Sequence, residues 1–384
     1  MMLNEYVLGD ICDVKIGRTP PRAEKKWFNH DGNSYKWVSI KDIGNCKKYI
    51  YSTSETITRE GQEKFNIPIV PKGTIILSFK LTVGRIAITT EDMLTNEAIA
   101  QIVIKDDTKV DKDYLYYYLK NYDYKSLGNT SSIGKAINSE IIKKMPIKLP
   151  DKCIQEEISS KLKAIDEKII VDNSIIDKYG KLLNDIYTNM FNSLDKSIKK
   201  ATELCDITIG KTPPRTEKEC FSTDNVGLKW ISISDMGNSG YYVFDTTENL
   251  TEQGYKKYNV KVVPKGTIIL SFKLTVGRIA ITTEDMLTNE AIAHFKLNDE
   301  TYKYYLFMYL KNYDYKSLGN TSSIGKAINS KIIKDMDIEI PEKSKVIDFN
   351  HNVSKIFEHI YVIEKEINNL ERVSVDIANK LIIK

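Results

Sequence analysis

Two segments of the chain have the residue types of a phosphate-binding loop. The sequence GNTSSIGKA occurs at residues 128–136 and again at residues 319–327. A nucleotide-binding loop needs four residues between its glycines and a hydroxyl side chain after its lysine, where the hydroxyl binds magnesium. Here five residues separate the glycines, and Ala136 and Ala327 follow the lysines. The segments therefore do not predict an ATP site, and their duplication is the stronger observation.

The cysteines and histidines do not form a recognisable catalytic or metal-binding set. The five cysteines are scattered without a CxxC pair, and the four histidines lie far apart except for His351 and His359. Eight residues apart on one helix, these two side chains would not converge on one metal. The sequence predicts neither a metal site nor a disulfide framework.

The bulk composition is that of a globular protein with more than one domain. The chain has 384 residues, of which 41% are hydrophobic and 28% are charged. Its net charge of +4 does not by itself indicate nucleic acid, so a DNA-binding surface would require local segregation of charge. No apolar run approaches the roughly 18 residues that span a bilayer, and the N-terminus lacks the features of a signal peptide. We therefore expect a cytoplasmic protein.

The chain contains two copies of one domain. Residues 71–100 recur without change at residues 264–293, and residues 118–139 recur without change at residues 309–330. Blocks this long and this far apart indicate a duplicated domain rather than a solenoid of short repeats.

Each copy has the pattern of a mixed α and β domain. In the first copy, residues 74–77 and 85–89 are rich in β-branched residues and predict two strands, with Gly84 between them. Residues 113–121, DYLYYYLKN, predict a helix whose aromatic stripe belongs to the core.

A long helix with a narrow apolar seam is predicted after each copy. In both segments apolar residues recur in two columns with alternating steps of three and four, the pattern of a helix packed against another helix. The columns are Ile158, Ile165, Tyr179 and Ile186 with Leu162, Ile169, Ile176, Leu183 and Met190, and Val346, Val353, Ile360, Ile367 and Leu381 with Phe349, Ile356, Ile363, Leu370 and Ile377. We expect an antiparallel pair of helices, each about 55–60 Å long. The predicted fold class is α+β: two duplicated mixed α/β domains joined by two long antiparallel coiled-coil helices.

Three loops in each copy carry side chains suited to contact DNA. They are the Thr-Pro-Pro turn, the segment around Gly84 or Gly277, and the GNTSSIGKA loop. Basic, hydroxyl and amide side chains contact phosphate oxygens and base edges, although each loop taken alone is also typical of a solvated turn. The predicted DNA-binding residues are Arg18, Thr19, Arg22, Lys80, Thr82, Arg85, Asn129, Ser131, Ser132 and Lys135 in the first copy, and Lys211, Thr212, Arg215, Lys273, Thr275, Arg278, Asn320, Ser322, Ser323 and Lys326 in the second.

Several short motifs occur in a fixed order along the chain. They are LGDI at 8–11, IGRTP at 16–20, LTVGRIA at 81–87, the aromatic helix at 114–119, and IKLP at 147–150 before QEEI at 155–158. The order of these motifs resembles the DNA specificity subunit of type I restriction–modification systems, and the resemblance covers essentially the whole chain, twice over. Leu81 stands where a glycine is common in that family, and residues 341–345 lack the glutamine found after the first copy.

The resemblance implies a subunit that recognises double-stranded DNA and performs no chemistry. It implies target-recognition domains at residues 1–150 and 197–341, and long helices at residues 151–196 and 342–384 that set the spacer and dock partners. Two methyltransferase subunits, and restriction–translocase subunits attached through them, would carry S-adenosylmethionine, ATP and magnesium. The sequence agrees, because it contains no [N/D]-P-P-[Y/F] methylation motif, no cofactor loop and no helicase loop.

Identical recognition loops predict a bipartite site that is close to an inverted repeat, with an adenine methylated on each strand. Two alternatives stay open at this point. One is the recognition subunit of a type IIB-like restriction enzyme, and the other is a coiled-coil scaffold that joins two protein-binding domains and touches no DNA.

Overall fold

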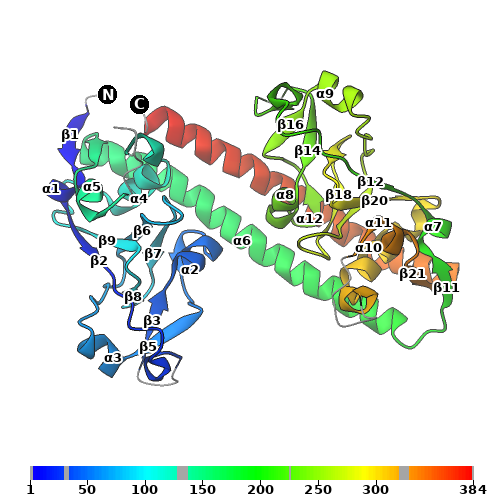
Figure 1. Ribbon diagram of the computed structural model, residues 1–384, viewed down its shortest axis with the longest axis horizontal. Coiled ribbons are helices and arrows are strands. Elements are labelled where there is room, and N and C mark those ends of the chain that lie inside the picture. Colours follow the sequence, from blue (N-terminus) through cyan, green and yellow to red (C-terminus); the bar gives the residue numbers. More distant parts are fainter. Residues whose placement is uncertain (1–2, 30–33, 128–136, 225, 320–327, 383–384) are drawn as a thin grey trace. The chain divides into compact units, whose positions relative to one another are not determined.

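The computed structural model describes residues 3–29, 34–127, 137–224, 226–319 and 328–382. The chain divides into two compact units, Met1–Lys168 with Glu371–Lys384, and Ile169–Leu370. Each unit contains one copy of the duplicated domain and one part of each long helix, α6 (Lys152–Phe191) and α12 (Lys343–Leu381) (Figure 1).

The described residues of the first domain form three small sheets. Their strand orders are β1-β10, β2-β9-β6-β7-β4 and β5-β3-β8. The strands are β1 (Asn4–Val7), β2 (Cys12–Ile16), β3 (Ser34–Val38), β4 (Tyr49–Ile50), β5 (Glu55–Thr58), β6 (Ile75–Ser78), β7 (Ile86–Thr89), β8 (Leu94–Thr95), β9 (Ile99–Ile104) and β10 (Pro146–Leu149). The helices are α1 (Leu8–Ile11), η1 (Lys25–Trp27), α2 (Ile40–Asn45), α3 (Arg59–Lys64), α4 (Lys112–Lys120), η2 (Tyr124–Leu127) and α5 (Ser139–Lys143).

The second domain repeats this topology. Its sheets have the orders β11-β21, β12-β20-β17-β18-β15 and β13-β16-β14-β19, so the five-stranded sheet has the same order in both copies. The strands are β11 (Ser197–Lys200), β12 (Cys205–Ile209), β13 (Phe221–Ser222), β14 (Leu228–Ile231), β15 (Tyr242–Val243), β16 (Glu248–Leu250), β17 (Ile268–Ser271), β18 (Ile279–Thr282), β19 (Leu287–Thr288), β20 (Ile292–Leu297) and β21 (Asp337–Ile340). The helices are α7 (Ala201–Leu204), η3 (Lys218–Cys220), α8 (Ile233–Asn238), α9 (Glu252–Lys257), η4 (Glu300–Tyr302), α10 (Lys303–Lys311), η5 (Tyr315–Gly319) and α11 (Ser330–Lys334).

The central strand β6 is buried along its whole length, and Ile75, Ile76 and Leu77 are apolar because both faces of the strand are covered. Successive side chains of a strand point to opposite faces. Ile75 and Leu77 lie in a core cluster with the tyrosines of α4, whereas Ile76 lies in a second cluster with Val38. The predicted aromatic stripe is confirmed as core, because Tyr114, Tyr116 and Tyr117 are all buried.

The helices α6 and α12 run antiparallel, as the apolar columns predicted. Within the second unit the ring of Phe191 lies 5.2 Å from that of Phe349, and Tyr179 lies beside His359. The later residue of α6 therefore meets the earlier residue of α12, which shows that the two helices run in opposite directions. Within the first unit Ile158 and Leu162 share a core cluster with Ala378 and Ile382. The expected fold class is therefore confirmed.

Two details of the seam differ from the sequence prediction. Leu381 was placed in an apolar column, but it is 38% exposed, and Ala378 and Ile382 are buried instead. In addition, three buried aromatic residues that belong to neither apolar column pack against α10 of the second domain. They are Tyr187, Phe191 and Phe357. Contact with a domain adds a face that a helix–helix pattern does not describe.

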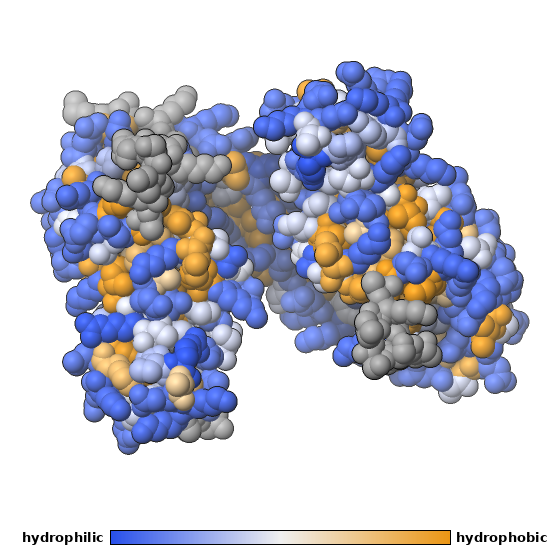
Figure 2. All heavy atoms as spheres, in the orientation of Figure 1, coloured by the Kyte–Doolittle hydropathy of each residue, from blue (hydrophilic) through white to orange (hydrophobic). Residues whose placement is uncertain are grey.

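Hydrophilic residues cover much of each unit in the face shown in Figure 2, and apolar residues gather in patches. Two large apolar side chains are exposed far more than any other among the described residues, Leu81 at 96% and Leu274 at 91%. No helix in the described part of the chain combines the length and the hydropathy needed to cross a membrane.

Candidate nucleic-acid interface

Two of the three predicted contact loops leave each five-stranded sheet at the same end. In the first domain the ends of β2 and β6 flank the beginning of β9, because Ile16 pairs with Ala100 and Ser78 pairs with Ile99. The loop after β2 contains the Thr-Pro-Pro turn, and the loop after β6 contains Gly84. The second domain has the same register, with Ile209 opposite Ala293 and Ser271 opposite Ile292.

The second basic residue of the Thr-Pro-Pro turn is held by a carboxylate and two aromatic rings. Arg22 Nη1 donates to both carboxylate oxygens of Glu55, at 2.6 and 2.8 Å. Its guanidinium lies 4.9 Å from the ring centre of Phe28 and 4.6 Å from that of Trp37. This arrangement fixes the turn while the side chain stays 53% exposed. The second copy repeats it with Arg215, Glu248, Phe221 and Trp230.

The first residues of the same turn are also anchored. Trp37 Nε1 donates to the carbonyl oxygen of Arg18 at 3.2 Å, and the hydroxyl of Thr19 is hydrogen-bonded to Glu97. Arg18 Nη1 donates to the carbonyl of Phe65 at 3.2 Å. In the second copy Trp230 donates to Lys211, and Thr212 is hydrogen-bonded to Glu290.

The loop between β6 and β7 is organised around Ser78. Its hydroxyl donates to the carbonyl of Thr82 at 2.6 Å and accepts from the backbone N–H of Arg85 at 3.0 Å. The guanidinium of Arg85 donates to the carbonyl of Ile40 at 2.9 Å, which ties the loop to the first turn of α2. Arg85 therefore supports the fold as well as being a predicted DNA contact. In the second copy the same bonds join Ser271, Thr275, Arg278 and Ile233.

The lysines of this loop have exposed side chains that contact the neighbouring phenylalanine rings. Lys80 and Lys273 are exposed, and within the described residues neither has a carboxylate partner. Thr82 and Thr275 are exposed beside them. The remaining candidates, on the GNTSSIGKA loops, lie outside the described residues; they are Asn129, Ser131, Ser132, Lys135, Asn320, Ser322, Ser323 and Lys326.

A buried polar network, which the sequence did not reveal, joins the first domain to α6. The Lys48 ammonium is buried, lies 2.8 Å from Asp113 Oδ1 and donates to the Tyr117 hydroxyl at 3.1 Å. Tyr117 in turn donates to Asp166 of α6 at 2.5 Å, and its pKa is raised by burial and by this hydrogen bond. The network therefore positions the domain on its helix rather than taking part in chemistry.

A different buried group joins the second domain to α12. Glu364 accepts hydrogen bonds from the backbone N–H groups of Tyr241 and Tyr242, at 2.8 and 2.9 Å. Burial raises the pKa of Glu364 to about 7, although the two N–H groups and Lys311 oppose this. A side chain at Gly240 would collide with the Glu364 carboxylate, so glycine is needed there for the close approach.

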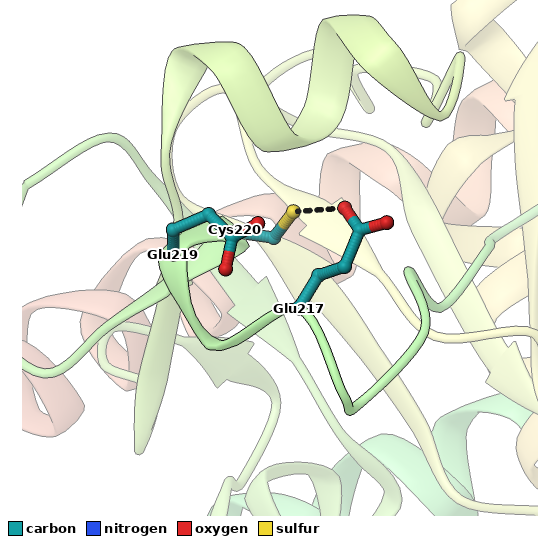
Figure 3. Close-up of side chains that lie close together, drawn as sticks. All are labelled: Glu217, Glu219 and Cys220. Atoms are coloured by element: carbon teal, nitrogen blue, oxygen red, sulfur yellow. Dashed lines mark hydrogen bonds between the residues drawn. The ribbon is translucent and has the colours of Figure 1, made fainter.

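Three possible metal ligands, Glu217, Glu219 and Cys220, lie within 4.8 Å of one another in the described part of the chain. Figure 3 shows the Sγ atom of Cys220 directed at the Glu217 carboxylate, to which it donates at 3.6 Å. Burial and this hydrogen bond raise the pKa of the thiol. Glu217 also pairs with Lys257 at 2.6 Å. A protonated thiol, and a carboxylate whose charge is already paired with a lysine, favour a structural role over metal binding.

The equivalent position in the first copy supports that interpretation. There Trp27 stands in place of Cys220 and donates through Nε1 to Glu24 at 2.8 Å, and Lys64 lies 3.6 Å from the same carboxylate. Both copies thus use one glutamate, one donor from the short helix and one lysine to close the same loop.

Comparison with known proteins identifies the family. A family model described as the type I restriction modification DNA specificity domain matches residues 3–178 and again residues 194–372. Because these segments cover most of the chain, the chain belongs to this family and carries its domain twice. It is a specificity subunit of the type I class, which recognises DNA and is not itself catalytic.

Relatives match along the length of the chain. The type I restriction enzyme MjaIX specificity subunit of Methanocaldococcus jannaschii is 23% identical over 416 residues, which cover 97% of this chain and 91% of the relative. The EcoBI specificity subunit of Escherichia coli is 23% identical over 381 residues, covering 89% and 77%. The crystal structure of the S subunit of a type I restriction–modification system from M. genitalium has the same fold, with a TM-score of 0.57 and 14% identity over 99% of this chain and 96% of that one.

Proposed function

We propose that this specificity subunit reads two nearly identical half-sites arranged as an inverted repeat. The observation that supports this is the identity of residues 71–100 with 264–293 and of residues 118–139 with 309–330. The described loops within these blocks also have the same internal hydrogen bonds in both copies, around Ser78 and Ser271. Identical donors and acceptors on the same backbone favour the same base edges.

The opposite directions of α6 and α12 suggest that the two half-sites are read on opposite strands. The recognition domains in this proposal are residues 1–150 and 197–341, joined by helices at 151–196 and 342–384. Segments that differ between the copies would alter a base or two in one half-site; they are residues 23–35 against 216–228 and 46–70 against 239–263.

The same proposal includes the partners. The long helices dock two methyltransferase subunits, which bring S-adenosylmethionine and methylate one adenine on each strand. Restriction subunits join through the methyltransferases and bring ATP and magnesium. The complex acts in the cytoplasm, and this chain itself holds no cofactor.

Sequencing of methylated bases in cells that express the chain with its cognate methyltransferase tests the proposal. We expect methylated adenines in a bipartite motif whose halves are related by inversion, with a difference of one or two bases at most. Two half-sites with nothing in common would contradict it. A mobility shift with the purified complex separates the DNA-binding function from a scaffold that binds only proteins.

A further inference from the structure

The loop between β6 and β7 has an exposed leucine at its tip, and this leucine has a left-handed backbone conformation. Leu81 is 96% exposed and has φ 61°, and its equivalent Leu274 is 91% exposed and has φ 62°. The left-handed region is unfavourable for a residue with a Cβ atom, and glycine or asparagine usually occupies it. Neither the burial of the side chain nor the backbone conformation explains why leucine stands here.

The surrounding hydrogen bonds hold the tip in this conformation. The Ser78 hydroxyl binds Thr82 and Arg85 on either side of the turn, and the backbone N–H of Gly84 donates to the Ser78 carbonyl at 2.9 Å. Gly84 has φ 90°, and a Cβ atom there would lie 2.9 Å from the ring of Tyr124. Tyr124 is itself fixed by its hydroxyl, which donates to the Leu119 carbonyl at 2.7 Å. The leucine side chain is therefore presented on a rigid turn.

The second copy builds the same frame from its own residues. Ser271 binds Thr275 and Arg278, and Gly277, with φ 91°, lies against the ring of Tyr315. Strained residues that the surrounding structure holds in place are concentrated at binding sites.

The chemistry next to each leucine is cationic. Lys80 precedes Leu81 and Lys273 precedes Leu274, and within the described residues neither lysine has a carboxylate partner. The Thr-Pro-Pro turn, with its own basic residues, leaves the sheet at the same end. One apolar side chain next to a lysine does not resemble a protein interface, which buries many residues on each side. It does resemble an apolar wedge that enters a base step while its neighbours contact phosphates.

We propose that Leu81 and Leu274 insert between adjacent bases of the DNA, one in each half-site, and partly unstack them. The inference rests on the proposed function, because it assumes that these loops face DNA, and it adds a way of reading sequence. A pyrimidine–purine step unstacks more easily than other steps, so each half-site should contain one at the contact point. Specificity at that step would come from the deformability of the DNA rather than from hydrogen bonds.

The test uses the complex of this chain with its methyltransferase partner and a duplex carrying the methylation motif. Fluorescent 2-aminopurine placed at successive positions reports unstacking. With the original chain we expect one position in each half-site to brighten on binding. With L81G/L274G, which relieves the backbone strain and removes the apolar side chain, we expect the brightening to disappear and binding to weaken by roughly tenfold or more.

Matched variants isolate the apolar side chain from the backbone. L81N/L274N tolerates the left-handed conformation without an apolar group and should behave as L81G/L274G does. L81M/L274M keeps an apolar side chain and should retain brightening and affinity. The slope of binding against salt should not change in any of these variants, because no phosphate contact is removed.

Three outcomes would overturn the inference. Unchanged affinity with L81G/L274G, together with no brightening at any position, would show that the leucines do not enter the DNA. Loss of methyltransferase from the purified variant complex would show that the leucines contact protein instead. Failure of the original complex to bind any methylated motif would overturn the proposed function and this inference with it, whereas the first two outcomes leave the proposed function intact.

Discussion

The two recognition domains expose the same loops but are attached to the long helices by different chemistry. In the first domain the backbone carbonyl of Lys48 accepts from Ile88, and in the second the carbonyl of Tyr241 accepts from Ile281. Lys48 and Tyr241 therefore occupy equivalent positions. Lys48 belongs to a buried ionic network that reaches Asp166 of α6, whereas Tyr241 belongs to an aromatic cluster around Phe357 of α12.

The second junction is built mainly from aromatic rings. The rings of Tyr304 and Phe357 are stacked with their centres 4.4 Å apart, and Phe307 meets Phe357 edge-on at 5.5 Å. Glu364 adds two backbone hydrogen bonds at one side of this cluster. The first domain has Asp113 and Tyr116 where the second has Tyr304 and Phe307.

This difference shows where sequence identity matters in the duplicated chain. The identical block at residues 71–100 and 264–293 holds both the loop after β6 or β17 and the buried strands that support it. The junctions differ because each domain has to fit only its own segment of helix. A domain moved to the other helix without its junction would leave Lys48 facing an aromatic cluster.

The largest expected effect at neutral pH is the loss of the ionic junction. In K48M the half-buried Asp113 loses its buried cation, and because breaking a fully buried pair costs about 3 to 5 kcal/mol, we expect a loss of roughly 2 to 3 kcal/mol here. We expect that loss in the free energy of unfolding of the first unit, measured by denaturant titration. The double variant K48M/D113N should lose clearly less than K48M alone, and equal losses would mean that the two groups are not coupled.

A second difference between the copies is a buried histidine at a position where the first copy has a glutamine. His294 is buried, bonds Thr288 and Thr208, and replaces Gln101 of the first copy. Burial lowers the pKa of His294 from 6.5 to about 4. The unfolded chain therefore binds a proton more tightly than the native state, so His294 costs the second unit stability as pH falls from 6.5 to 4. The full loss is about 3 kcal/mol.

Glu364 has an effect of similar size and opposite sign. Its pKa rises from 4.5 to about 7 on folding, so the native state binds the proton more tightly. The stability it contributes is present below pH 4.5 and is lost as pH rises to 7. In the original chain the two groups largely offset each other over this range.

Single substitutions should separate the two opposite dependences of stability on pH. H294Q should leave the second unit losing stability as pH rises from 4.5 to 7, whereas E364Q should leave it losing stability as pH falls from 6.5 to 4. Unfolding monitored across this pH range checks both variants. Parallel curves for the two variants would contradict the assigned shifts.

The smallest expected effect concerns the shared loops. K80A/K273A removes one exposed cation from each copy, and each lost phosphate contact lowers the salt dependence of binding by about 0.9. We expect the log–log slope to flatten by about two. R85A/R278A should flatten it equally if those arginines also meet phosphates; an unchanged slope with lower stability would leave them only the structural role at Ile40 and Ile233.

The sequence predicted the parts of the fold that depend on periodicity and repetition. The duplicated blocks, the strands on either side of Gly84, the aromatic helix and the two long helices all follow from local patterns. The network of Lys48, Asp113 and Asp166 could not be predicted, because its members are far apart in the chain and each is ordinary alone. Their pairing depends on the tertiary fold.

The candidate site was predicted only in part. Arg22 and Arg85 stay predicted DNA contacts, and the structure adds their hydrogen bonds to Glu55 and to the Ile40 carbonyl, which the residue types did not suggest. Leu81 did leave a signal, because it stands where a glycine is common in the family. A position that favours glycine often has a positive φ, and a leucine there is a reason to look for function.

The division of the chain has a consequence for its synthesis. The first unit consists of Met1–Lys168 and Glu371–Lys384, so Ile158 and Leu162 complete their packing only with Ala378 and Ile382. In the sequence, the whole second unit, Ile169–Leu370, falls between these two pieces. The first domain therefore cannot complete its packing until the last segment of the chain has been translated. Until then, part of its apolar surface stays uncovered while the second domain is translated and folds. Chaperone binding during translation should concentrate on the first half of α6.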